Sequence, residues 1–250
     1  MAVVAALVSL FSFKGIEASA QIKTPVKNIV IVHGAFADAS GYEAVYNILK
    51  KDGYNVTLVQ NPLTSLNDDV AAVNRALEMQ DGPVVLVGHS WGGSVITQAG
   101  ISSKVRSLVY IAAFAPELNE STLDVYKSGP ALAKNGILDA DDHGISYFDK
   151  SLFFECFAGD LTKEKAAFMA DSQQPIAGAC FTTPLTQAAW KLKPVYAIVA
   201  TEDKAIHPDL QRSMYTRANA IVTEIKGSHA VYVSQPKMVA KVIETAANIL

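Results

Sequence analysis

The chain has 250 residues and no internal repeat, a length at which one domain can bury most of its apolar surface. Half of its residues are hydrophobic and only 18% are charged, which is below the roughly 25% typical of soluble domains, so a well-filled core is expected. The net charge of -3, from 21 Lys and Arg against 24 Asp and Glu, provides no basic field for a phosphate backbone and argues against a nucleic-acid partner.

The N-terminal segment has the pattern of an export signal. Residues 2–13 form an apolar run that is too short to span a bilayer as a helix, so no stable membrane span is expected. Small residues follow at positions 18–20, where signal peptidase recognises them, although no Lys or Arg precedes the apolar run. We predict that residues 1–20 are a signal peptide, cleaved before Gln21, and that the protein is periplasmic or secreted. The alternative is a disordered or docked N-terminal extension.

Apolar runs alternate with amphipathic stretches along most of the remaining chain. The run at 26–32 (VKNIVIV) is almost continuously apolar, as in a strand that is buried on both faces of a parallel sheet. Similar runs recur at 56–60, 84–87, 105–111, 195–200 and 221–225. Helical spacing is found at 42–50, 68–79, 94–101, 208–218 and 236–250. The alternation predicts an α/β fold: a doubly wound, mostly parallel sheet covered by helices on both faces, with reactive groups at the carboxyl ends of its strands.

The alternation stops between residues 116 and 193. This stretch has helical spacing around 122–132 and 162–172, no clear strand, and many aromatic residues. We interpret residues 116–193 as a helical cap, inserted after the fourth strand, which divides the core into residues 21–115 and 194–250.

The two cysteines, Cys156 and Cys180, match no metal-binding spacing, and no metal site is predicted. In an oxidising compartment the two could form a disulfide. The alternative, given equal weight, is two separate buried or partly buried thiols.

The strand at 84–87 leads into a candidate nucleophile. Residues 88–92, GHSWG, have the pattern G-x-S-x-G, and the small and aliphatic residues 93–96 that follow can open a helix. A strand-to-helix turn this sharp holds the serine in a strained backbone conformation and requires glycine at the flanking positions. Ser90 is therefore expected to project its hydroxyl into a cleft, whereas His89 inside the turn is interpreted as structural.

A serine hydroxyl is protonated at neutral pH, so it requires a base, and the base requires an orienting acid. Asp203 follows the strand at 195–200 and His229 follows the strand at 221–225. Both positions are carboxyl ends of strands, and the chain between them has room for one crossover helix, one strand and two loops. His229 is therefore predicted as the base and Asp203 as the acid, in the order Ser, Asp, His that is expected on this fold.

Less favoured alternatives are Glu202 as the acid and a helix N-terminal role for Asp203. His143 and His207 are expected to be exposed. An oxyanion hole requires two N–H donors, each contributing roughly 3 to 4 kcal/mol to the stability of the transition state. The amide of Trp91, directly after the nucleophile, and that of Ala35, in the loop after the first strand, are predicted to supply them.

Five segments carry a family resemblance: VIVHGAF, VGHSWGG, YIAAFAPE, VATEDKAI and IKGSHA. From residue 26 to the C-terminus the chain resembles the α/β-hydrolase superfamily, and within it the small serine esterases related to plant methyl-salicylate esterase and the hydroxynitrile lyases. The resemblance implies the α/β-hydrolase fold, the triad Ser90, Asp203 and His229, and the oxyanion pair Ala35 and Trp91. It also implies hydrolysis of a small-molecule ester or lactone without a cofactor.

Departures from the family pattern separate the alternatives. Hydroxynitrile lyases have a threonine after the first-loop histidine and a lysine after the catalytic histidine, where this chain has Gly34 and Ala230. The resemblance therefore favours ester hydrolysis over cyanide release. Perhydrolase chemistry, which uses the same triad, and a non-catalytic receptor on the same fold remain alternatives.

Overall fold

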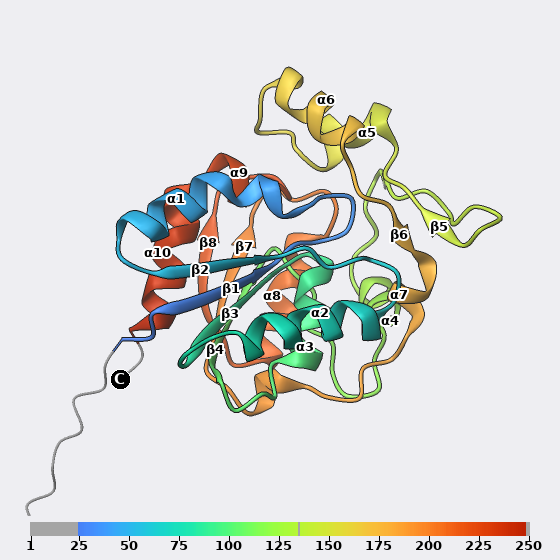
Figure 1. Ribbon diagram of the computed structural model, residues 1–250. Helices are drawn as coiled ribbons and strands as arrows, with labels where there is room; N and C mark the ends of the chain where they lie inside the picture. Colours follow the sequence, from blue (N-terminus) through green and yellow to red (C-terminus); the bar gives the residue numbers. More distant parts are fainter. Residues whose placement is uncertain (1–24, 135, 249–250) are drawn as a thin grey trace, which may run out of the picture.

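The computed structural model describes residues 25–134 and 136–248 (Figure 1). The predicted signal peptide, residues 1–20, lies outside the described residues, so its cleavage before Gln21 stays a prediction. In the described part of the chain, no helix is both long enough and apolar enough to span a bilayer.

In the part of the chain that the structure describes, six strands form one parallel sheet in the order β2-β1-β3-β4-β7-β8. The strands are β1 (Asn28–Val32), β2 (Asn55–Val59), β3 (Val84–His89), β4 (Val105–Ile111), β7 (Val195–Ala200) and β8 (Ile221–Ile225). The ranges expected for β4, β7 and β8 coincide with the observed ones. β1 and β3 differ by two residues at one end, and β2 is shifted by one residue at both ends. The predicted α/β fold with a doubly wound parallel sheet is therefore confirmed.

Helices cover both faces of the sheet (Figure 1). One layer holds α1 (Glu43–Lys51), α9 (Val231–Ser234) and α10 (Pro236–Ala247), and the other holds α2 (Leu66–Glu78), α3 (Trp91–Ala99) and α8 (Pro208–Arg217). Successive side chains of a strand point to opposite faces, so Ile29 and Ile31 of β1 pack in the first layer while Val30 and Val32 pack in the second. This two-sided burial explains the continuous apolar run at the start of β1.

The ends of two helices follow local sequence signals. Helix α2 begins at Leu66, two residues before the expected start, because the Ser65 hydroxyl accepts a hydrogen bond from the amide of Asp68. Helix α4 (Thr122–Ser128) ends four residues before the expected end at 132. Gly129 and Pro130 follow it, and a residue that precedes proline is disfavoured in the helical conformation.

Residues 116–193, which we call the insertion, connect β4 to β7. Besides α4 they contain β5 (Ile145–Ser146), α5 (Lys150–Cys156), α6 (Lys163–Asp171), β6 (Ile176–Ala177), α7 (Gly178–Thr182) and the 3-10 helix η2 (Ala189–Lys191). The expectation that this stretch lacks strands was wrong, because β5 and β6 pair antiparallel. Each has two residues, which is too short to produce an alternating sequence pattern. Cys156 and Cys180 are separate buried thiols, so the unpaired alternative is the observed one.

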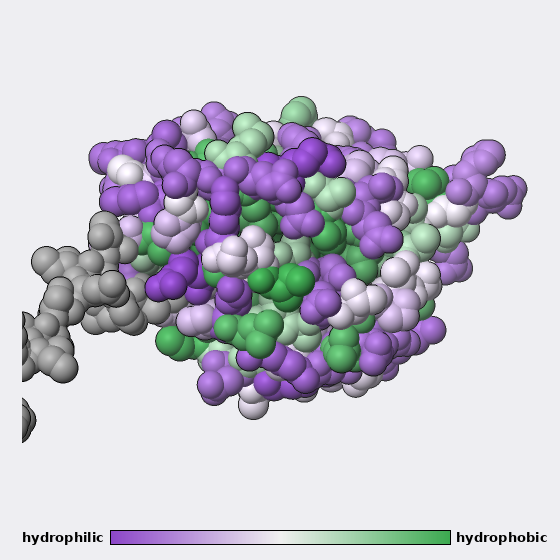
Figure 2. Space-filling model, turned by 60° about the horizontal axis from the view of Figure 1, so that its bottom comes forward, coloured by the Kyte–Doolittle hydropathy of each residue, from purple (hydrophilic) through white to green (hydrophobic). Residues whose placement is uncertain are grey.

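Figure 2 shows a face on which apolar residues lie among polar ones. The exposed large apolar side chains come from many parts of the chain, such as Met79, Phe168 and Leu192. Apolar side chains scattered singly are normal on the surface of a folded domain and do not by themselves mark an interface.

Candidate active site

Ser90 occupies the sharp turn between β3 and α3. Its backbone has φ 52° and ψ -122°, a conformation that non-glycine residues rarely adopt, and this matches the strain expected of the turn. Glycine is required nearby because a Cβ at Gly88 would lie 2.5 Å from the carbonyl oxygen of Gly92. A Cβ at Gly93 would lie 2.2 Å from the carbonyl oxygen of Phe114. Gly88 therefore permits the close approach of β3 to α3, and Gly93 permits the close approach of α3 to the chain that follows β4.

Ser90, His229 and Asp203 form one continuous hydrogen-bonded relay. The Ser90 Oγ lies 2.9 Å from His229 Nε2, and His229 Nδ1 lies 2.7 Å from Asp203 Oδ2. The three residues are 7%, 1% and 3% exposed, respectively, so water has little access to the hydrogen bonds between them. The structure thus brings together the three side chains that the sequence predicted, each from the carboxyl end of a different strand.

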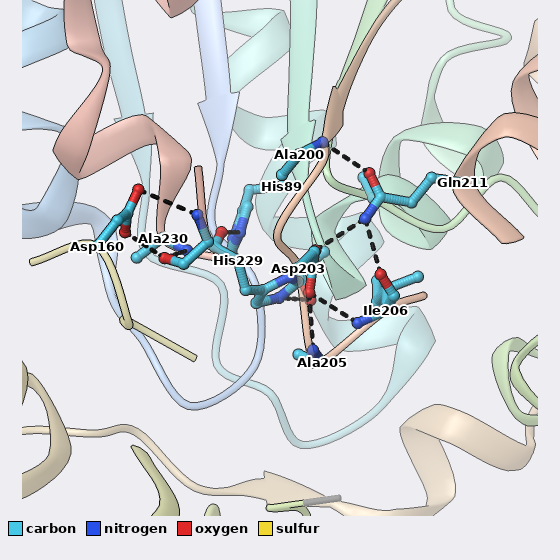
Figure 3. A network of polar contacts seen from close by, with 12 residues as sticks. His89, Asp160, Ala200, Asp203, Ala205, Ile206, Gln211, His229 and Ala230 are labelled. Carbon is cyan, nitrogen blue, oxygen red and sulfur yellow. Dashed lines mark hydrogen bonds and ion pairs between the residues drawn. The ribbon is translucent and has the colours of Figure 1, made fainter. Parts of the chain in front are cut away.

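The Asp203 carboxylate is fixed by donors other than His229 (Figure 3). Its Oδ1 accepts from the amides of Ala205 at 2.7 Å and Ile206 at 2.9 Å, and its Oδ2 accepts from Gln211 Nε2 at 2.8 Å. Gln211 is fully buried in α8 and also accepts from the amide of Ala200 at 3.1 Å. Sequence reasoning missed Gln211, because nothing in its local pattern distinguishes it from the other polar residues of the expected helix.

The alternative acid, Glu202, lies outside this relay. Its side chain is 51% exposed and its carboxylate lies 3.5 Å from Lys226 Nζ, at the surface. Adjacent residues after a strand point in different directions, which is why only Asp203 reaches the imidazole.

His89 contacts the His229 residue of this relay. Its Nε2 donates to the backbone carbonyl of His229 at 3.0 Å, and the two rings lie 4.7 Å apart. Burial, reinforced by the neighbouring His229, holds the pKa of His89 well below its usual value, so its ring is neutral at pH 7. The interpretation of His89 as structural agrees with this position.

The other two histidines differ from each other. His143 is exposed, as expected. His207 is half-buried rather than exposed, because its Nδ1 accepts from the amide of Asp209 at 3.1 Å and caps α8.

The two predicted oxyanion donors flank Ser90. Trp91 is the first residue of α3, so its amide N–H has no acceptor within the helix. Ala35 lines the same cavity as Ser90, and the preceding residue, Gly34, approaches so closely that a Cβ there would lie 2.7 Å from the Ser90 Cβ. Both residues thus lie near Ser90, and their role as oxyanion donors stays a prediction.

The Trp91 side chain is held by a carboxylate that sequence reasoning missed. Its Nε1 donates to Asp69 Oδ2 at 2.7 Å, and Asp69 also accepts from the amide of Leu63 at 2.8 Å and from Asn61 Nδ2 at 3.2 Å. Asp69 is fully buried, and burial raises its pKa in spite of these three hydrogen bonds. Asp69 lies in the first turn of the helix expected at 68–79, where an acidic residue is common, so nothing in the local pattern pointed to a contact 22 residues away.

A cavity of about 180 Å³ opens at Ser90 and His229. Aromatic side chains form much of its wall: Phe36, Phe114, Tyr126, Phe148, Phe157 and Phe181. Among the described residues that line it, none is Lys or Arg, and the only carboxylate, Asp139, is exposed. The described part of the cavity wall is therefore largely apolar and carries no fixed positive charge. Among the described residues, no three His, Cys, Asp or Glu side chains lie together in a way that could hold a metal ion.

A parallel sheet with a serine at the β3–α3 turn, and with an acid and a histidine after two later strands, defines the α/β-hydrolase fold. The chain matches the model of the alpha/beta hydrolase family over residues 29–242. It therefore belongs to this family, and the resemblance predicted from the sequence is confirmed.

Relatives and solved structures agree with this membership. The chain is 27% identical to the alpha/beta hydrolase nvfD of Aspergillus novofumigatus, over 88% of this chain and 96% of that protein. It is also 27% identical to a chloroplastic Arabidopsis thaliana protein provisionally named methylesterase 11, over 89% of this chain and 64% of that protein. A solved structure of polyneuridine aldehyde esterase superposes with a TM-score of 0.75 at 19% identity, covering 89% of this chain and 99% of the other. At that identity the likeness shows the fold.

Proposed function

We propose that this chain is a serine esterase that hydrolyses small, uncharged, mostly apolar carboxylic esters or lactones through an acyl-enzyme. The observation that carries the proposal is the unbroken relay from Ser90 through His229 to Asp203. Support also comes from a relative named as a methylesterase and from a structural neighbour named as an esterase.

In the first half of the proposed reaction, the Ser90 oxygen attacks the carbonyl carbon of the ester while its proton passes to His229 Nε2. The negative charge that develops on the carbonyl oxygen is held by the amides of Ala35 and Trp91. When this tetrahedral intermediate collapses, the bond to the alcohol oxygen breaks, and the leaving alcohol takes the proton from His229. The product of this half is an ester between the acyl group and Ser90.

In the second half, His229 removes a proton from water, and the resulting hydroxide attacks the acyl-enzyme. The second tetrahedral intermediate expels Ser90, which recovers its proton from His229. Asp203 keeps its orientation, because it accepts hydrogen bonds from two amides and from Gln211. It keeps the imidazole in the tautomer whose Nε2 can accept the serine proton.

The cavity wall supports the choice of substrate class and of reaction. Without Lys or Arg among the described lining residues, a substrate carboxylate or phosphate would lose its hydration without gaining a partner. Because none of the described lining residues is a fixed cation, a cyanide anion would find no such partner in this cavity, which favours hydrolysis over the lyase alternative.

Direct labelling tests the proposal. The wild-type protein is expected to hydrolyse p-nitrophenyl acetate and to lose this activity on reaction with a fluorophosphonate, which phosphonylates serines activated by a base. Peptide mass spectrometry should locate the label on Ser90. Binding of esters without turnover and without labelling would instead indicate the receptor alternative, and a label on another serine would contradict the assigned nucleophile.

Acyl-chain length should matter because the cavity is small. We expect kcat/KM for p-nitrophenyl acetate or butyrate to exceed that for the dodecanoate by at least about 10-fold, since a twelve-carbon chain exceeds a volume of about 180 Å³ and must stay partly in water. The measurement is a series of p-nitrophenyl esters below their aggregation limits. A preference for the long chain would contradict a substrate site confined to this cavity.

A further inference from the structure

The turn after α5, residues 157–160 of the insertion, contacts the backbone on both sides of His229. Asp160 Oδ2 accepts from the amide of Ser228 at 3.0 Å, and Asp160 Oδ1 accepts from the Ser228 hydroxyl. On the other side, the carbonyl of Phe157 accepts from the amide of Ala230 at 3.0 Å. The Phe157 ring also packs edge-on against the His229 imidazole, with centroids 4.8 Å apart and an interplanar angle of 82°.

The Ser228 hydroxyl joins these contacts into one unit. While it donates to Asp160, its oxygen accepts from the amide of Ala230 at 3.1 Å. Figure 3 shows the Asp160 carboxylate beside residues 228–230, on the side of His229 away from Asp203. Ser228 is 5% exposed although Asp160 itself lies at the surface, so the hydrogen bonds sit at the boundary between the buried relay and the solvent.

The core contacts residues 227–230 through their carbonyl groups. The carbonyls of Ser228 and Ala230 accept from the amides of Val231 at 3.1 Å and Val233 at 2.8 Å, both in α9. His89 holds the carbonyl of His229, and the amide of Glu202 donates to the carbonyl of Gly227 at 3.0 Å. By contrast, the amide N–H groups of Ser228 and Ala230, on either side of His229, donate to acceptors in the insertion, namely the Asp160 carboxylate and the Phe157 carbonyl. Rotation of the backbone at residues 228 and 230 would swing the imidazole away from Ser90, and the insertion opposes this rotation.

We infer that Asp160 is a positioning residue, which acts through Ser228 to hold the His229 imidazole within reach of the Ser90 hydroxyl. The inference rests on the proposed esterase function. It makes the insertion part of the machinery that orients the base, in addition to forming a wall of the substrate cavity. Asp160 does not line that cavity, so its effect should fall on the chemical step and not on substrate binding.

Kinetics with p-nitrophenyl acetate test the inference. Asp160→Ala is expected to lower kcat by about 10- to 100-fold, because small displacements of a catalytic group carry penalties of this size, while KM changes by less than about two-fold. Asp160→Asn, which keeps an acceptor for the Ser228 amide, should recover part of the lost kcat and serves if the alanine variant does not fold. The matched control is Asp171→Ala, which removes a carboxylate of the same insertion that pairs with Lys150 at the surface.

A double-mutant cycle with Ser228→Ala checks the route of the effect. If Asp160 acts through Ser228, the double variant should lose no more kcat than Asp160→Ala alone. Fully additive losses would overturn the inference, as would a kcat for Asp160→Ala that equals that of Asp171→Ala. A raised KM at unchanged kcat would overturn it too, because the effect would then lie in the cavity.

A spectroscopic measurement separates failure of the inference from failure of the proposed function. The proton between His229 Nδ1 and Asp203 should give a far-downfield proton NMR resonance that does not depend on turnover. Asp160→Ala is expected to shift or broaden this resonance, and Asp171→Ala is expected to leave it unchanged. An identical resonance in the wild type and Asp160→Ala would overturn the positioning role, whether or not the wild type hydrolyses esters.

Discussion

Ser90→Ala is expected to lower the kcat for p-nitrophenyl acetate by about a million-fold, the size of effect measured when the nucleophile of a serine hydrolase is removed. The variant keeps the cavity and both oxyanion amides, but it has no atom that can form the acyl-enzyme. Any residual rate would come from binding and oxyanion stabilisation alone. The measurement is the release of p-nitrophenol by purified wild-type and variant protein under the same conditions.

Ser94→Ala provides the matched control. Ser94 lies one turn further along α3 and is fully buried, and its hydroxyl forms a hydrogen bond of 2.7 Å with the Thr122 hydroxyl. Its loss should cost about 1 kcal/mol of stability and leave kcat within a few-fold of wild type. Equal rates for Ser90→Ala and the wild type would remove the catalytic role of Ser90.

Asp203→Asn is expected to lower kcat by about 1,000- to 10,000-fold with little change in KM. An amide at this position presents an N–H₂ group to His229 Nδ1, so the imidazole would carry its proton on Nε2 and could not accept the proton of Ser90. The same amide would also face the Nε2 donor of Gln211, which now bonds to Asp203 Oδ2. A pre-steady-state burst assay should show that acylation itself is slowed.

Glu202→Gln separates the two candidate acids. Because Glu202 is half-exposed and near Lys226, its neutralisation should change kcat by less than about three-fold, as is usual for surface charges. A larger loss in Glu202→Gln than in Asp203→Asn would contradict the assignment of the acid.

The features that could be predicted from the sequence are those with a local signal. The bounds expected for β4, β7 and β8 agree with the observed ones. For β4 and β7 the reason is that strands buried in a parallel sheet require nearly continuous apolar runs. Ser90 was recognised from its flanking glycines, and His229 and Asp203 from their positions directly after strands, where a parallel sheet gathers side chains at one edge. Their convergence follows from topology and required no knowledge of packing.

The features that could not be predicted depend on contacts between distant segments. Gln211 bonds to Asp203 across the start of α8, Asp69 reaches Trp91 from the preceding helix, and Asp160 reaches Ser228 over 68 residues. Each of these residues has an ordinary sequence neighbourhood, so its role becomes visible only when the partner is in place. The short pair β5 and β6 was missed because two residues cannot display a period.

The position of β8 has a consequence for how activity can be lost. Among the described strands, β8 lies at the edge of the sheet and has β7 as its one neighbour. Its first residues, Ile221 and Val222, are 60% and 41% exposed. Ser90, in contrast, follows a strand with neighbours on both sides. Fraying is easiest where a strand is least enclosed. If β8 detaches together with His229, catalytic activity is therefore expected to be lost while most of the core is still folded.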